Sequence, residues 1–223
     1  KRSLEDALRF ASTDSERAFA RAELGWLLVN ARETERATAF LEEAVRESAR
    51  DPDVHARALG RQVVARIYAG HLDRAAEALL AAEAIEDAAP ATRALLAGWR
   101  GQLASAKGDP GARSLAFQEA ARRYEEVGDV RRAAAAKTNL ADAWNRVGAY
   151  AEAEDSLRRA LIDCRRVGHR LMEGYALLNL GYACTMQRKT MQATAALADC
   201  TSIAKETEDK RLQLWCRIYQ ARA

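Results

Sequence analysis

Apolar residues recur along the chain at the three- and four-residue spacing of an amphipathic helix. Ala153, Leu157 and Ala160, for example, would share one helix face. No run of alternating Val, Ile, Thr and aromatic residues stands between turn clusters, so strand signals are absent. Three prolines and twelve glycines leave few helix breakers in 223 residues. The pattern predicts an all-α fold.

The helical pattern is repeated, and in the second half of the chain its period is about 40 residues. The matching segments are Val127-Gly128-Asp129 with Val167-Gly168-His169, Asn139-Leu140 with Asn179-Leu180, and Ala153-x3-Leu157 with Ala193-x3-Leu197. Because this agreement extends through two successive helical segments, each repeat is expected to be a helical hairpin.

Glycine and proline mark the ends of the predicted helices. Gly70, Gly108 and Gly148 recur at nearly the same spacing, at the expected turn between the two helices of successive hairpins. Glycine suits that place because it adopts the left-handed conformation that ends many helices. Pro52 and Pro90 open first helices, where a missing N–H costs nothing. In the second and third hairpins the register is fixed only to within one position.

The repeat resembles the tetratricopeptide family, whose unit reads W-x2-L-G-x2-Y and then A-x3-F. The matching residues are Leu24-Gly25 with Ala37-x3-Leu41, Leu140-Ala141 with Ala153-x3-Leu157, and Leu180-Gly181 with Ala193-x3-Leu197. The units here, at about 38 to about 40 residues, are longer than the family's usual unit of about 34. They look like those of kinesin light chains, spindle-orientation scaffolds, and sensor regions of bacterial transcription activators and signalling ATPases.

The resemblance implies a right-handed α-solenoid superhelix of about five hairpins and a final helix. It is expected to form one domain over 1–223, within a longer protein. The predicted hairpins cover 15–49, 52–86, 91–126, 130–167 and 170–206, followed by a helix at 209–223.

Charge adds little to this picture. The formal net charge is +3, with −2 over 1–111 and +5 over the remainder. No concentrated basic stripe indicates a nucleic-acid partner. The densest arginines are expected to form a solvated outer face; they are Arg158, Arg159, Arg165 and Arg166. No apolar stretch approaches the roughly 20 residues of a membrane span, so no membrane partner is expected.

The sequence carries none of the common catalytic or phosphate-binding motifs, so we expect no enzyme activity, metal or cofactor. Four cysteines are well separated in helical segments, without a C-x-x-C pair; they are Cys164, Cys184, Cys200 and Cys216. We interpret them as reduced packing residues, in keeping with a cytoplasmic protein.

In the family that the chain resembles, first helices line a concave surface that holds the ligand. The resemblance places eleven residues there: Trp26, Asn30, Asn139, Asp142, Asn145, Arg146, Tyr175, Asn179, Tyr182, Met186 and Tyr219. Four further positions in the second and third hairpins are Arg61, Tyr68, Trp99 and Gln102.

An asparagine amide both donates and accepts, so it can bridge to the backbone of an extended peptide. Tyrosine supplies rigid contact area and a hydroxyl. Asn139 and Asn179 would form a ladder of this kind, or would hydrogen-bond neighbouring helices instead. For Trp99 and Trp144, filling the core is the favoured interpretation.

Three functions fit these features. The favoured one is a protein- or peptide-binding scaffold or regulatory module of a larger bacterial signalling or transcription-regulating protein. The first alternative is a small-effector sensor coupled to an attached ATPase, kinase or DNA-binding domain. The second is a self-associating solenoid that forms homo-oligomers through its ends.

Overall fold

The computed structural model describes residues 2–222. Within this range the chain forms twelve helices and no strand, which confirms the all-α prediction. The chain divides into two compact units, one ending at Asp109 and one beginning at Pro110. None of the helices over 2–222 is long and apolar enough to cross a membrane.

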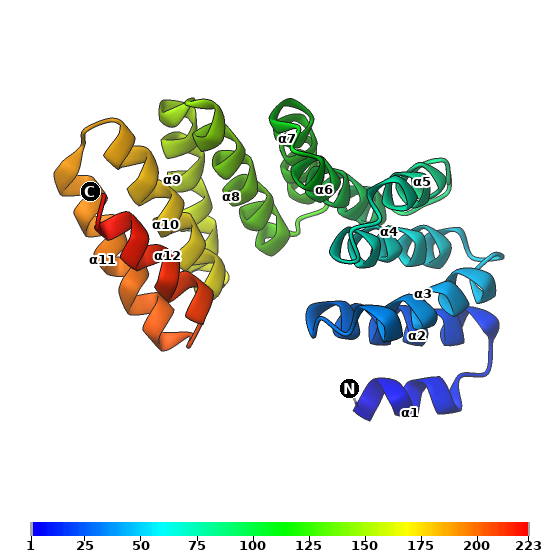
Figure 1. Ribbon diagram of the computed structural model, residues 1–223. Helices are drawn as coiled ribbons and strands as arrows, with labels where there is room; N and C mark the ends of the chain where they lie inside the picture. The colour runs from blue at the N-terminus through cyan, green and yellow to red at the C-terminus, as the bar shows by residue number, and fades with distance from the viewer. Residues whose placement is uncertain (1, 223) are drawn as a thin grey trace. The chain divides into compact units, whose positions relative to one another are not determined.

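The first unit stacks helices in chain order (Figure 1). Its helices are α1 (Arg2–Phe10), α2 (Asp14–Asn30), α3 (Thr34–Glu47), α4 (Pro52–Tyr68), α5 (Leu72–Glu83) and α6 (Pro90–Lys107). Helix α2 pairs with α3 and α4 pairs with α5, while α6 packs on both α4 and α5. The first helices α2, α4 and α6 also contact one another in sequence.

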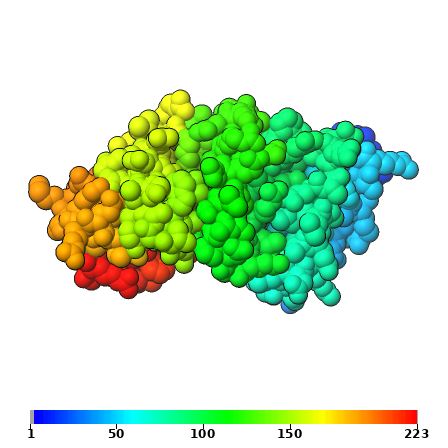
Figure 2. Space-filling model, turned by 90° about the horizontal axis from the view of Figure 1, so that it is seen from above, coloured from blue at the N-terminus to red at the C-terminus, as the bar shows by residue number. Residues whose placement is uncertain are grey.

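The second unit follows the same plan. Its helices are α7 (Pro110–Glu126), α8 (Val130–Val147), α9 (Tyr150–Arg166), α10 (Arg170–Met186), α11 (Thr190–Glu206) and α12 (Lys210–Gln220). Each helix packs on the next, and α10 contacts both α8 and α12. Within each unit the surface colours follow the chain from helix to helix, as expected where every hairpin contacts only its neighbours (Figure 2).

Helix pairs α2–α3, α4–α5, α8–α9 and α10–α11 lie where the sequence predicts hairpins, and α12 lies at the predicted final helix. The predicted hairpin at 91–126 covers α6 and α7, which belong to different units. Helix α6 packs within the first unit and α7 packs on α8. A single continuous domain over 1–223 stays a prediction of the sequence.

The helix ends follow from local chemistry. Thr13 forms a capping box with Glu16 at the start of α2. Gly108 and Gly148 end α6 and α8 with φ of 73° and 84°, the left-handed conformation expected of them. Arg188 takes the place of Gly148 in the next repeat and adopts the same conformation, with φ of 59°. The repeat therefore preserves the turn geometry even where glycine is replaced.

The repeat motif has a glycine because the two helices of each hairpin pack closely at that position. A Cβ added to Gly25 would lie 2.7 Å from Leu41 Cγ, and one added to Gly181 would lie 2.6 Å from Leu197 Cγ. The leucine of each second helix thus fills the space above the glycine of its first helix. Both leucines are fully buried, so this contact anchors each hairpin.

Trp99 belongs to the core of the first unit. Its side chain is buried, and a Cβ on Gly60 would lie only 2.0 Å from its ring. The ring of Trp26 packs beside it with centroids 6.5 Å apart. These contacts support core filling at Trp99. Trp144 also packs against the core, in the second unit.

The four cysteines are buried and free, as the sequence predicts. Burial and a hydrogen bond with the Cys216 thiol raise the pKa of Cys200 far above its usual range. Burial also raises the pKa of Cys164 and Cys184. A buried thiol with a raised pKa forms little thiolate, so these three cysteines are expected to act as packing residues.

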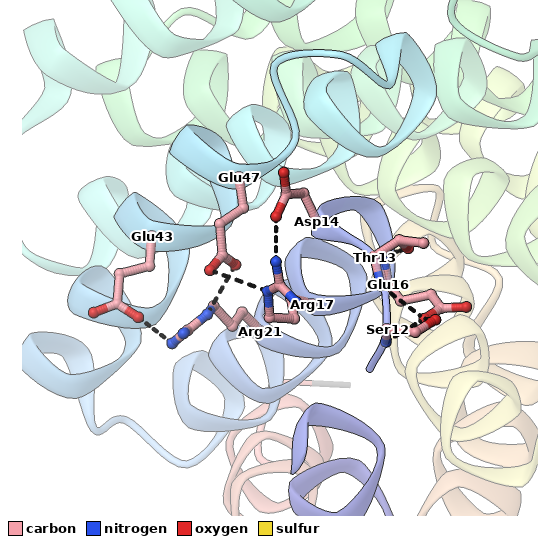
Figure 3. A network of polar contacts seen from close by, with 8 residues as sticks. All are labelled: Ser12, Thr13, Asp14, Glu16, Arg17, Arg21, Glu43 and Glu47. Carbon is pink, nitrogen blue, oxygen red and sulfur yellow. Dashed lines mark hydrogen bonds and ion pairs between the residues drawn. The ribbon is translucent and has the colours of Figure 1, made fainter. Parts of the chain in front are cut away.

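Ion pairs tie the first hairpin together on its surface (Figure 3). Arg21 on α2 binds both Glu43 and Glu47 on α3, and its Nε lies 2.9 Å from Glu47 Oε2. Arg17 binds Asp14 one turn earlier on α2. Because these side chains are still partly exposed to solvent, they contribute modestly to stability and mainly fix how α2 and α3 align.

Candidate functional site

The candidate surface is formed by the first helices of the second unit. We call it the α8–α10–α12 face and define it by Asn139, Asp142, Arg146, Tyr175, Asn179, Tyr182, Met186, Trp215 and Tyr219. Helix α10 contacts α8 and α12, so equivalent positions of the repeat lie on one side of the unit. Most of the residues predicted from the sequence belong to this one face.

Four aromatic side chains form a continuous row, three of them on this face and one, Tyr150, at the start of the neighbouring helix α9. The ring centroids are 6.2 Å apart for Tyr150 and Tyr182, 5.2 Å for Tyr182 and Tyr219, and 5.8 Å for Tyr219 and Trp215. None of the four is fully buried, and Trp215 is 37% exposed. The aromatic row is a rigid, partly solvated surface of the kind that protein interfaces use as anchors.

Two members of the aromatic row, Tyr150 and Trp215, are not predicted from the sequence. Tyr150 is the first residue of α9, so a search restricted to first helices passes over it. Trp215 takes the place of Tyr175, a predicted site residue, one repeat further along the chain. Extending the repeat into the final helix would therefore have found Trp215, whereas Tyr150 needed the structure.

A polar cluster adjoins the aromatic row. Arg113 of α7 is buried and forms an ion pair with Asp142 of α8. The same carboxylate lies 3.3 Å from Nε of Arg146, which is exposed. Asp142 is therefore held between two guanidinium groups, and its negative charge is largely neutralised within the protein.

Asn145 connects α8 to α10. Its side chain is 3% exposed, and its Nδ2 donates to the backbone oxygen of Asn179 at 3.1 Å. Its Oδ1 is buried and has no hydrogen-bond partner among residues 2–222. The structure thus gives Asn145 a bridging role between two first helices, in place of the ligand contact expected from the sequence.

Asn139 and Asn179 take part in the same contacts through their backbones. The carbonyl of Asn139 accepts from Arg113 at 3.5 Å, and that of Asn179 accepts from Asn145. Both side-chain amides are partly exposed and make no hydrogen bond within the described part of the chain. The amides are therefore available to a ligand, as the ladder hypothesis requires.

Two tyrosines of the face, Tyr175 and Tyr219, are neutral hydrogen-bonding groups. Burial raises the pKa of Tyr219, and the Asp142 carboxylate adds to the rise, while Arg146 and Arg222 oppose it. Burial, together with the nearby Asp209, also raises the pKa of Tyr175. These hydroxyls keep their protons at neutral pH and can donate to a carboxylate or carbonyl oxygen.

Met186 is exposed at the end of α10 and extends the apolar part of the face. Tyr175, by contrast, is half-buried and packs against the core of the unit.

The candidates in the first unit form a separate set, most of which make contacts within that unit. Asn30 Nδ2 donates to the backbone oxygen of Trp26 at 2.9 Å. Arg61 is buried and paired with Glu23. The guanidinium of Arg32 lies over the exposed ring of Tyr68, 4.1 Å from the ring centroid.

No family model matches the sequence, and no curated protein matches it. Several solved structures are similar to this chain. The chain is similar to BtubC (BKLC) from P. vanneervenii, with a TM-score of 0.76 and 18% identity over 93% of this chain and 89% of that one. It is also similar to a Signal Transduction ATPase with Numerous Domains (STAND) protein with a tetratricopeptide repeat sensor from Pyrococcus horikoshii. There the TM-score is 0.80, with 14% identity over 91% of this chain and 32% of that one.

A third similar structure is YrrB, described as a TPR protein with an unusual peptide-binding site. Its TM-score is 0.56, with 17% identity over 96% of this chain and 97% of that one. At these identities the likeness establishes the fold, and the tetratricopeptide-type hairpins expected from the sequence are confirmed.

Proposed function

We propose that this chain, which has the tetratricopeptide-repeat fold, is a binding module that holds a peptide segment of another protein on its α8–α10–α12 face. The observation that carries the proposal is the aromatic row of Tyr150, Tyr182, Tyr219 and Trp215. Because each ring packs against the next, the four side chains are already ordered and lose little conformational entropy when a ligand packs on them. The neighbouring amides of Asn139 and Asn179 suit the backbone of an extended peptide.

The module acts by binding, and no catalysis is assigned to it. The likeness to a STAND protein with a repeat sensor favours a second role, in which the same face senses a ligand for attached domains of a larger regulator. Both roles require a ligand on the α8–α10–α12 face, and they differ in the ligand's size and in what lies beyond this chain.

Replacing Tyr182 by alanine should weaken peptide binding by about 1–3 kcal/mol, because Tyr182 contacts two other rings at the centre of the row. To test this, a phage-displayed random peptide library is selected on the purified protein. The strongest peptide is then measured by calorimetry on the wild type and on Tyr182→Ala.

The matched control is Arg159→Ala on α9, because Arg159 is exposed and forms no ion pair within residues 2–222. Arg158 and Arg165 are less suitable, since they bind the buried carboxylates of Glu154 and Glu173. Thermal melts should show all variants folded. If the library yields no peptide, or if Arg159→Ala abolishes binding while Tyr182→Ala does not, the proposal is wrong.

A further inference from the structure

Charge is divided between the two kinds of helix in the second unit. The first helices α8, α10 and α12 carry eight Lys and Arg against two Asp and Glu, a formal charge of +6. The second helices α7, α9 and α11 carry eight against nine, a formal charge of −1. The chain as a whole is nearly neutral, but the first helices of its second unit are basic.

The first unit has the same division. Its first helices α2, α4 and α6 carry eight basic and four acidic residues, whereas α3 and α5 carry three basic and seven acidic residues. Both acidic residues on the first helices of the second unit are already paired: Asp142 with Arg113, and Glu173 with Arg165 and Arg170. Both carboxylates of these helices are thus engaged within the protein.

Three cations lie beside the face's aromatic side chains. Arg146 lies at the end of α8, beside Asp142, and Arg211 lies one turn before Trp215 on α12. Arg222 follows Tyr219, and its backbone N–H donates to the Tyr219 carbonyl at 3.1 Å. All three side chains are exposed. Arg211 and Arg222 form no ion pair within the described residues, and Arg146 makes a single contact with Asp142 at 3.3 Å.

This arrangement selects among the ligands that aromatic rings attract. Rings also bind cations, but a cationic ligand here would be repelled by Arg146, Arg211 and Arg222. A nucleic acid needs cations that follow a continuous phosphate backbone. On the same helices Arg132, Lys137 and Arg170 are paired with carboxylates of the protein, so the available cations are isolated points around the rings. Isolated cations of this kind match the carboxylates of a peptide, which are spaced along its chain.

We infer that the ligand of the α8–α10–α12 face is an acidic peptide segment, whose apolar side chains pack on the aromatic row while its carboxylates meet Arg146, Arg211 and Arg222. The inference rests on the proposed peptide-binding function and adds the charge of the partner. The acidic second helices of the first unit and the near-neutral ones of the second give such a segment no comparable attraction, so charge also helps to choose the face.

The peptide library gives the first test. Sequences enriched on the wild-type protein should be richer in Asp and Glu than the unselected library. The strongest peptide is then synthesised with every Asp and Glu replaced by Asn and Gln, and this neutral form should bind at least about tenfold more weakly. A single-stranded DNA oligonucleotide should compete poorly with the acidic peptide.

The second test is a charge reversal on the protein. The variant Arg146→Glu with Arg222→Glu should bind the acidic peptide at least about tenfold more weakly, and the loss should shrink as salt is added. The control makes the same change in charge on second helices, with Arg159→Glu and Lys205→Glu, at exposed residues without ion pairs over 2–222. Melting curves check that both variants are folded.

The outcomes separate the two proposals. If neutral or basic peptides are enriched, or if the neutral form binds as well as the acidic one, the charge inference is overturned and peptide binding stands. Equal weakening by the two charge reversals, or equal competition by the oligonucleotide, shows a general affinity for polyanions and also overturns the inference. If no peptide is enriched at all, the proposed function fails and the inference fails with it.

Discussion

Replacing Trp99 by alanine is expected to lower the free energy of unfolding of the first unit by about 3–5 kcal/mol. The Trp99 side chain is buried, and its ring lies against the backbone of Gly60 and beside Trp26. No other side chain can move into the space without leaving its own packing, so a cavity would remain. Urea unfolding followed by far-UV circular dichroism measures the change.

Trp215→Ala makes the same substitution at a partly exposed site and serves as the control. It should change stability far less, and it should weaken peptide binding because it shortens the aromatic row. Equal loss of stability in the two variants would mean that Trp215 is also a core residue and that the face is misassigned.

Leu197→Ala is expected to cost about 2–5 kcal/mol in the second unit. Leu197 is 1% exposed and fills the space above Gly181, where the two helices of the hairpin come closest. Alanine at this position would leave a void between α10 and α11. The same urea titration, repeated with Leu115→Ala, gives the comparison.

Leu115 is 70% exposed on α7, so its truncation should change the free energy of unfolding by less than about 0.5 kcal/mol. A small effect at Leu197 would show that the glycine–leucine contact does not hold the hairpin together. It would also remove the structural explanation of the repeat motif.

Much of the fold could be predicted because each repeat must bury the same face in the same way. The motif that pairs Leu180-Gly181 with Leu197 in the sequence is a direct contact in the structure. The repeat also predicts the turn at Gly148, and Arg188, at the equivalent position one repeat later, adopts the same backbone conformation. Spacing determines these features because they depend on position along the helix and on side-chain size.

The details of the site depend on contacts that spacing does not specify. Asn145 has the position of a ligand-binding residue, yet it is buried and bonded to the backbone of Asn179. Arg113 lies on a second helix and reaches across to Asp142 on a first helix. The sequence predicts on which helix and which face each residue lies, but not with which neighbour its polar atoms form a hydrogen bond or an ion pair. The division between Asp109 and Pro110 likewise has no counterpart in the repeat pattern.

The most direct test of the central claim is hydroxyl-radical footprinting of the protein with and without its selected peptide, read by mass spectrometry. This method reports the solvent exposure of individual side chains, and methionine and aromatic residues react readily. Met186 lies on the α8–α10–α12 face, whereas Met191, at 89% exposure, lies at the start of the second helix α11.

The account predicts that the peptide protects Tyr182, Tyr219, Trp215 and Met186, and leaves Met191 as reactive as before. Protection of Met191 with unchanged oxidation of Tyr182 and Tyr219 would place the ligand on another surface and contradict the assignment of the α8–α10–α12 face.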